Sequence, residues 1–79
     1  MFYVYALASC TRQYVYVGLT NDVERRLFQH NNGENRSTKA YKPFRLIWKE
    51  ECKTRPEARM REKQMKSGVG KEYFRSLVK

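Results

Sequence analysis

Two apolar runs near the start of the chain predict a β-hairpin. Residues 2–8 (FYVYALA) and 14–18 (YVYVG) are rich in tyrosine and valine, and the five polar residues SCTRQ separate them. Tyrosine and valine favour strands, and a connection of this length is common in hairpins. Successive strand side chains point to opposite faces, so tyrosines two positions apart share a face. An aligned register would gather Tyr3, Tyr5, Tyr14 and Tyr16 on one side and Val4, Val15 and Val17 on the other.

The next segment has the spacing of an amphipathic helix. Val23 and Leu27 are four positions apart and form an apolar stripe. Asn21 is a suitable N-cap, and Glu24 three residues later resembles a capping box. An Asn-Gly pair then supplies a stop. We therefore expect a helix over about residues 21–31.

The following polar and apolar segments predict a loop, a strand and a second helix. Residues 34–43 are polar and basic and close with proline, which is typical of a loop. Residues 44–51 (FRLIWKEE) predict a third strand. Thr54 and Glu57 form a capping box that begins a second helix, and Gly68 is expected to end it.

The last nine residues, 71–79, predict a short third helix with Phe74, Leu77 and Val78 facing inward. The expected order is β-β-α-β-α-α, in a single domain over residues 1–79. This order predicts an α+β fold in which helices flank a small three-stranded antiparallel sheet.

Composition adds a partner to this picture. The chain has 17 Lys and Arg against 8 Asp and Glu, for a net charge of +9. Such an excess in a small domain indicates a polyanionic partner, with nucleic acid first and an anionic membrane surface second. No apolar run reaches the roughly 20 residues of a membrane span, and we expect no secretory signal. The basic residues are not confined to one amphipathic helix, so membrane binding is disfavoured.

Cysteine and histidine usage narrows the chemistry. Cys10 and Cys52 are isolated from one another and form no CxxC pair. They indicate reduced thiols and a cytoplasmic location rather than a disulfide framework or a zinc site. His30 is the only histidine, which excludes a histidine-rich metal centre.

One carboxylate occupies a position that apolar residues usually take. Ala58, Glu62 and Met65 share a helix face by their spacing, and this face should meet the sheet. A buried carboxylate is costly unless it is paired or bound to a metal. Glu62 is thus either a metal ligand or an ion-paired residue, with Lys66 or a nearby arginine as the partner.

Arg26 and His30 are also four positions apart, on the flank of the first helix's apolar stripe. An arginine there could grip a phosphate through two hydrogen bonds. The alternatives are an arginine that extends to solvent and a histidine favoured by the helix dipole. The tyrosines have a similar alternative, which is aromatic packing; a phenol becomes useful as a base only beside a cation or metal.

Taken in order, these residues resemble the GIY-YIG nuclease superfamily. The tripeptides Tyr3-Val4-Tyr5 and Tyr16-Val17-Gly18 resemble its paired tripeptides, and GLTNDVERRLFQHNNG resembles its helix. The resemblance covers nearly the whole chain and extends to small standalone members and to the catalytic domain of the excision-repair incision nuclease. The positions that carry it are Tyr5, Tyr16, Gly18, Arg26, His30 and Glu62.

The resemblance implies hydrolysis of a phosphodiester with one divalent metal ion, Mg²⁺ or Mn²⁺. Glu62 would hold the metal, as a hard oxygen ligand suits such ions. Tyr16 would be the general base for the attacking water, and Tyr5 would help to position that water or the phosphate. Arg26 would neutralise charge on the phosphate.

Further roles follow from the same resemblance. His30 would assist by hydrogen bonding or proton relay, and Gly18 would let nucleic acid approach the strand closely. Tyr14 would pack or stack on a base. Leu19 stands where repair-type relatives carry lysine, and Lys39 is the candidate replacement cation. Tyr3 also replaces the first glycine, and no counterpart is found for the asparagine that some relatives carry beyond the glutamate.

We therefore expect an endonuclease that acts on DNA rather than RNA. It should have weak sequence preference and select its substrate by structure, such as branched, damaged or single-stranded DNA. A monomer is assumed. The alternative is a non-catalytic basic nucleic-acid-binding module with the same fold, because the charge alone predicts salt-sensitive, nonspecific binding. A third interpretation places a different nuclease site at Glu51-Cys52-Lys53, which lacks a well-placed second acidic residue.

Overall fold

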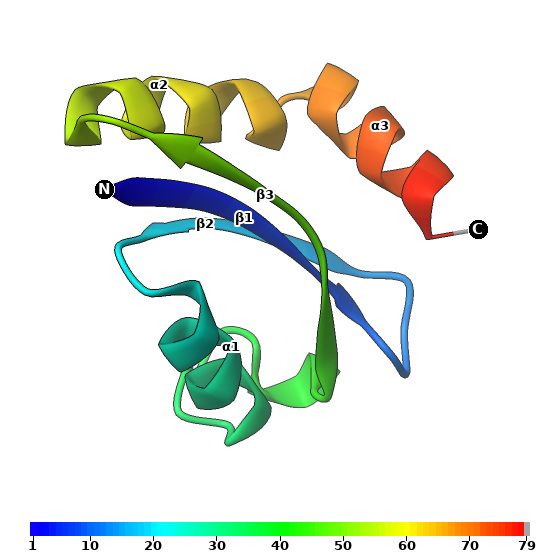
Figure 1. Ribbon diagram of the computed structural model, residues 1–79. Helices are drawn as coiled ribbons and strands as arrows, with labels where there is room; N and C mark the ends of the chain where they lie inside the picture. The colour runs from blue at the N-terminus through cyan, green and yellow to red at the C-terminus, as the bar shows by residue number, and fades with distance from the viewer. Residues whose placement is uncertain (79) are drawn as a thin grey trace.

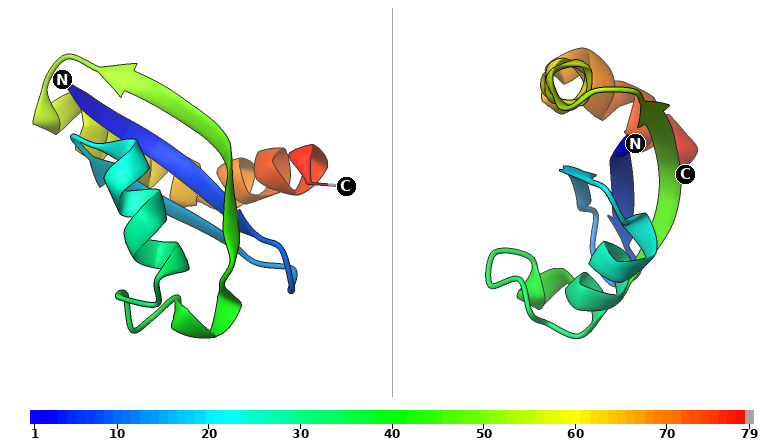
Figure 2. Two further views of the ribbon diagram at one scale, coloured as in Figure 1. Left: turned by 60° about the horizontal axis from the view of Figure 1, so that its bottom comes forward. Right: turned by 60° about the vertical axis from the view of Figure 1, so that its left-hand side comes forward.

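The computed structural model describes residues 1–78 and has the expected α+β architecture. A three-stranded antiparallel sheet has the order β2-β1-β3, with the first strand in the centre (Figure 1). Helix α1 covers one face of the sheet, and α2 and α3 cover the other (Figures 1 and 2). The elements are β1 (Phe2–Ser9), β2 (Val15–Thr20), α1 (Val23–Asn31), the 3₁₀ turn η1 (Lys39–Tyr41), β3 (Phe44–Cys52), α2 (Arg55–Lys66) and α3 (Gly68–Leu77).

The register of the hairpin aligns the tyrosines as expected. Tyr5 of β1 pairs with Gly18 of β2, and Leu7 pairs with Tyr16. All four tyrosines of the hairpin pack with the apolar cluster on the α1 side, around Tyr5, Leu7, Val23 and Phe44. On the opposite side, Val4, Val15 and Val17 join the cluster beneath α2 and α3, which contains Ala6, Cys52, Ala58, Met65 and Phe74. The two faces predicted from strand alternation are confirmed.

The first helix begins two residues later than expected. Asp22, not Asn21, is the N-cap, and its side chain accepts a hydrogen bond from the backbone N–H of Arg25. The Asp22 N–H is in turn held by the Thr20 hydroxyl at 3.0 Å, which fixes the residue outside the helix. An aspartate at this position also places its negative charge at the positive end of the helix dipole.

The junction between α2 and α3 differs from the sequence prediction. The capping prediction for α2 is confirmed, because the Thr54 hydroxyl accepts the backbone N–H of Glu57. However, α2 ends at Lys66, and Gly68 begins α3 instead of ending α2. Gly70 permits this tight junction, since a Cβ there would collide with the carbonyl group of Met65. The boundary between α2 and α3 depends on this close contact between Gly70 and Met65, which the spacing of residues along the chain does not reveal.

The inward face of α3 was only partly predicted. Phe74 is 1% exposed and packs on Trp48, with ring centroids 5.5 Å apart. Leu77 is 43% exposed, so its expected inward position is wrong. Val78 follows the helix and is half-buried, and the final residue of the expected 71–79 segment lies outside the described residues.

Both cysteines are free thiols, with Cys10 exposed and Cys52 buried in the core beneath α2. Burial raises the pKa of the Cys52 thiol, which keeps it protonated. Among the described residues, no helix has the length and apolar character that crossing a membrane requires.

Candidate active site

Two tyrosines from neighbouring strands converge on the α1 face. The rings of Tyr5 and Tyr16 have centroids 6.1 Å apart. Gly18, opposite Tyr5 in the ladder, leaves room for both of them. A Cβ at Gly18 would lie 2.7 Å from the Tyr5 hydroxyl oxygen and 2.8 Å from a carbon of the Tyr16 ring. The close approach that this glycine permits is therefore made by the two phenols, and any larger residue would push them apart.

Helix α1 brings His30 and Arg26 to the same place. The His30 ring is fully buried, with its centroid 4.6 Å from that of Tyr16. Its Nε2 atom lies 3.4 Å from the Tyr5 hydroxyl, and its Nδ1 atom lies 2.8 Å from the hydroxyl of Thr38. The i,i+4 spacing predicted that Arg26 and His30 share a helix face, and both contact the tyrosine pair.

The Arg26 guanidinium is the positive charge of this cluster. It lies beside Tyr5 and Tyr16 and donates a hydrogen bond to the Gln29 side chain at 3.0 Å. These phenols raise the pKa of Arg26 above its ordinary value, and Tyr5 has the largest effect. Attraction between a histidine and the helix dipole does not account for the contacts of His30, because its ring is buried against the rings of Tyr5 and Tyr16.

Burial raises the pKa of Tyr5 and lowers the pKa of its neighbour His30. The pKa of Tyr5 is raised because burial disfavours the phenolate, although the nearby Arg26 guanidinium opposes the rise. The pKa of His30 is lowered by burial and then by the charge of Arg26. At neutral pH, His30 is thus a neutral imidazole with one donor and one acceptor nitrogen.

Glu62 lies on the other side of the sheet, on the face of α2 that carries Ala58 and Met65. Its carboxylate pairs with the Lys66 ammonium at 3.2 Å and the Arg59 guanidinium at 3.7 Å. The ion-paired interpretation of this residue is therefore confirmed. Within residues 1–78, the contacts found for Glu62 do not join it to the tyrosines, whereas Tyr5, Tyr16, Arg26 and His30 contact one another.

Glu62 offers a divalent metal ion a single carboxylate. No group of three or more metal-binding His, Cys, Asp or Glu side chains occurs in residues 1–78, so the protein offers no cage of its own for an ion. A single carboxylate with an 11% exposed side chain fits Mg²⁺ or Mn²⁺ that keeps several waters and binds substrate phosphate. Lys66 and Arg59, both more than half exposed, can swing away from it.

Two of the three expected nucleic-acid contacts, Lys39 and Tyr14, lie at the edge of the same face. Lys39 is exposed at the start of η1, with its side chain beside Gly33. Tyr14 stacks on Tyr41 with centroids 4.0 Å apart, and the Arg12 guanidinium lies over the Tyr41 ring. One face of Tyr14 is already covered by a protein ring, so packing accounts for this tyrosine at least in part.

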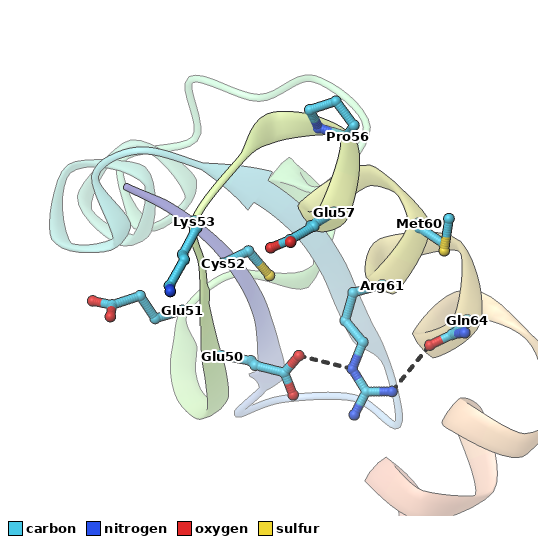
Figure 3. Close-up of a pocket in the computed structure, with 9 residues that line it drawn as sticks. All are labelled: Glu50, Glu51, Cys52, Lys53, Pro56, Glu57, Met60, Arg61 and Gln64. Carbon is cyan, nitrogen blue, oxygen red and sulfur yellow. Dashed lines mark hydrogen bonds and ion pairs between the residues drawn. The ribbon is translucent and has the colours of Figure 1, made fainter.

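A shallow groove elsewhere tests the third interpretation. It lies between the end of β3 and α2 and is lined by Glu50, Glu51, Cys52, Lys53, Pro56, Glu57, Met60, Arg61 and Gln64 (Figure 3). Glu50 is neutralised by Arg61 at 2.9 Å, and Glu51 extends away from both Glu50 and Glu57. The carboxylates do not converge, which gives no support to a metal site at Glu51-Cys52-Lys53.

Two contributors to the α1 face were missed in the sequence. Thr38 is fully buried although it lies in a polar loop, and it holds His30. Asn31, the last residue of α1, joins the end of that helix to β3, since its side chain donates to the Phe44 carbonyl and accepts the Phe44 N–H. A polar residue in a loop or at a helix end carries no periodic signal, so only the tertiary contacts reveal these two.

Comparison with known protein families gives a match over most of the chain. A model of the GIY-YIG catalytic domain matches residues 1–74. A UPF0213 protein from Staphylococcus saprophyticus is 35% identical over 66 residues, which cover 82% of this chain and 79% of that protein. A UPF0213 protein from Haloquadratum walsbyi is 41% identical over 66 residues, covering 82% and 73% of the two chains.

A solved structure supports the same relationship. The solution NMR structure of the UPF0213 protein from Bacillus halodurans has 36% sequence identity and a TM-score of 0.56. The match covers 98% of this chain and 85% of the other. The sequence matches and the structural match therefore indicate the same relationship, with UPF0213 proteins.

Proposed function

This chain belongs to the GIY-YIG nuclease superfamily, and from that premise we propose that it is a divalent-metal-dependent endonuclease that hydrolyses DNA phosphodiester bonds. One observation carries the proposal. Two phenols, an imidazole and a guanidinium, from β1, β2 and α1, converge on one face of the sheet in a chain of net charge +9. The guanidinium can neutralise charge on a phosphate, and a cation beside a phenol favours its phenolate form.

Exposure divides the roles of the tyrosines. Tyr5 is fully buried, whereas Tyr16 is partly exposed. Tyr16 is therefore the phenol that can meet an attacking water and take its proton as the general base. Tyr5 lies beside Arg26 and helps to position the guanidinium where that group can neutralise charge on the phosphate.

Glu62 is the residue that the family resemblance assigns to Mg²⁺ or Mn²⁺, and a bound ion would stabilise negative charge on the phosphate of a substrate strand that reaches α2. Arg59 and Lys66 would then exchange the carboxylate for the flanking phosphates of the substrate. His30 keeps its neutral ring against both phenols and orients them.

The test uses labelled plasmid, single-stranded, flap and four-way-junction DNA, with Mg²⁺, Mn²⁺ or EDTA. Glu62→Ala is expected to abolish cleavage and leave binding intact or slightly tighter, because a negative charge is lost. Glu72→Ala, which removes the same charge from the exposed face of α3, is the matched control and should cleave normally. Normal cleavage by Glu62→Ala would contradict the one-metal proposal.

A second candidate is a non-catalytic module that binds nucleic acid through charge. Two observations favour it: Leu19, at the position where the resemblance to repair-type members implies a lysine, packs with the apolar side of the sheet, and Glu62 is paired within α2. Salt-sensitive binding to every DNA without metal-dependent cleavage of any DNA or RNA would support this module over the nuclease.

A further inference from the structure

A continuous line of hydrogen-bonding groups runs through the α1 face. It starts at the Tyr5 hydroxyl, beside Arg26, passes through His30 and Thr38, and ends at the backbone carbonyl of Asn35. Tyr5, His30 and Thr38 are each 0% exposed. Because solvent cannot reach these groups, each must find its partner within the line.

The polarity of the line is fixed at its Asn35 end. A carbonyl only accepts, so the Thr38 hydroxyl donates to the Asn35 oxygen at 3.4 Å, beside the backbone N–H of Thr38 at 3.2 Å. With its single proton committed, the Thr38 hydroxyl must accept from His30 Nδ1 at 2.8 Å.

We propose that Thr38 is a positioning residue that fixes His30 in the tautomer protonated on Nδ1. In this tautomer Nε2 accepts the hydroxyl proton of Tyr5, 3.4 Å away. Every donor in the line then has an acceptor, and all of the bonds run in one direction, from Tyr5 to Asn35.

The direction matters for the site. With its proton turned toward His30, the Tyr5 oxygen presents its lone pairs to the positive charge of Arg26, which lies beside both phenols. In the opposite tautomer, Nε2–H would donate to the same oxygen and turn the Tyr5 proton away from His30, toward the cation. The loop that carries Thr38 thus sets the orientation of the Tyr5 hydroxyl through His30, as outer partners do for metal-binding histidines. This consequence for catalysis rests on the proposed function, whereas the tautomer itself does not.

The chain offers a direct test because His30 is its only histidine. Protein labelled with ¹⁵N-histidine gives one imidazole, and long-range ¹H–¹⁵N correlation at neutral pH distinguishes a protonated nitrogen from an unprotonated one. We expect a protonated Nδ1 and an unprotonated Nε2 in the wild-type protein without DNA or metal. A protonated Nε2 in that spectrum would overturn the proposal, whether or not any variant folds.

Three substitutions separate positioning from packing. Thr38→Val keeps the shape but loses the acceptor, and should shift the tautomer toward protonated Nε2. Thr38→Ser keeps the hydroxyl and should preserve the wild-type spectrum, as should Thr11→Val, a control at an exposed threonine. An unchanged tautomer in Thr38→Val would contradict the role of Thr38.

Cleavage gives the second readout. Thr38→Val should lower kcat by about 10- to 100-fold with KM unchanged, and Thr38→Ser should restore the rate. If the tautomer is as proposed but no DNA is cut, the proposed function fails and the positioning inference stands. If DNA is cut while the tautomer is reversed, the positioning inference alone fails.

Discussion

The two faces of the sheet are built from the same three strands but for different purposes. Beneath α2 and α3, the buried residues are aliphatic or small, and Phe74 closes the layer against Trp48. Beneath α1, the burial is aromatic and polar, with His30 and Thr38 fully enclosed. Apolar packing of the first kind stabilises the fold without directional demands, whereas the second kind requires every donor and acceptor to match.

This division teaches where a small chain can place chemistry. A domain of this size buries a modest fraction of its surface, so one face must supply most of the stability. The face under α2 and α3 does so and allows the α1 face to hold phenols and an imidazole that pack less efficiently. Glu62, at the margin of the apolar face, is the exception and is matched by two cations.

The largest effect should come from opening the apolar face. Phe74→Ala removes a ring that is 1% exposed, and should reduce the free energy of unfolding by about 3–5 kcal/mol, which is much of the stability of a small domain. Urea denaturation followed by circular dichroism measures the change. Leu77→Ala, on the exposed face of the same helix, is the control and should change stability by about 0.5 kcal/mol or less. Equal losses in both variants would show that the apolar face does not carry the fold.

The α1 face should respond in activity rather than stability. Tyr16→Phe removes only a hydroxyl from a partly exposed ring, so the ring packing remains. We expect cleavage to fall by about a hundredfold or more, with the unfolding midpoint almost unchanged. Tyr73→Phe, at the exposed tyrosine of α3, is the matched control and should retain full activity. A large loss of stability in Tyr16→Phe would place this tyrosine in the structural group instead.

A smaller difference should separate cations on the two sides. Lys39 lies at the rim of the α1 face and Lys71 lies on α3, and both are exposed. If nucleic acid binds across the α1 face, Lys39→Ala should weaken binding several-fold and reduce the slope of log K against log salt by about 1. Lys71→Ala should leave that slope unchanged. Fluorescence anisotropy over a salt series measures both, and equal slopes in the two variants would argue for binding without a preferred face.

The parts of this molecule that the sequence predicts are those governed by local period and caps. The alternation of tyrosine and valine over residues 2–8 and 14–18 determines both faces of the hairpin, and Thr54 with Glu57 determines the start of α2. The start of α3 was missed because it depends on how closely Gly70 approaches Met65 across the junction.

The sequence indicated which candidate residues share a helix or strand face, but not how those faces are arranged in space. The helical spacing of Arg26 and His30 indicated a shared face, and the structure adds their contacts with Tyr5. Which side of the sheet each helix covers is a tertiary property, so nothing in the spacing of Glu62 indicated its separation from the tyrosines. Thr38 carries no periodic signal, because its burial comes from the path of the loop over His30.

The smallest effect expected is a pH dependence of stability that belongs to the α1 face alone. The pKa of His30 is lowered in the folded state by burial and by Arg26, while the unfolded value is about 6.5. Below about pH 6.5 the unfolded chain therefore binds more protons, so the contribution of His30 is present above that pH and is lost as the pH falls toward the lowered value. Tyr5 and Arg26, which also lie beside this ring, have raised pKa values and do not change charge in this window. Urea midpoints measured from pH 7.5 to 5 should fall in the wild-type protein and fall less in His30→Gln. If the two profiles were parallel, the buried imidazole would contribute nothing to the acid sensitivity of the fold, and the contrast between the two faces would be one of activity alone.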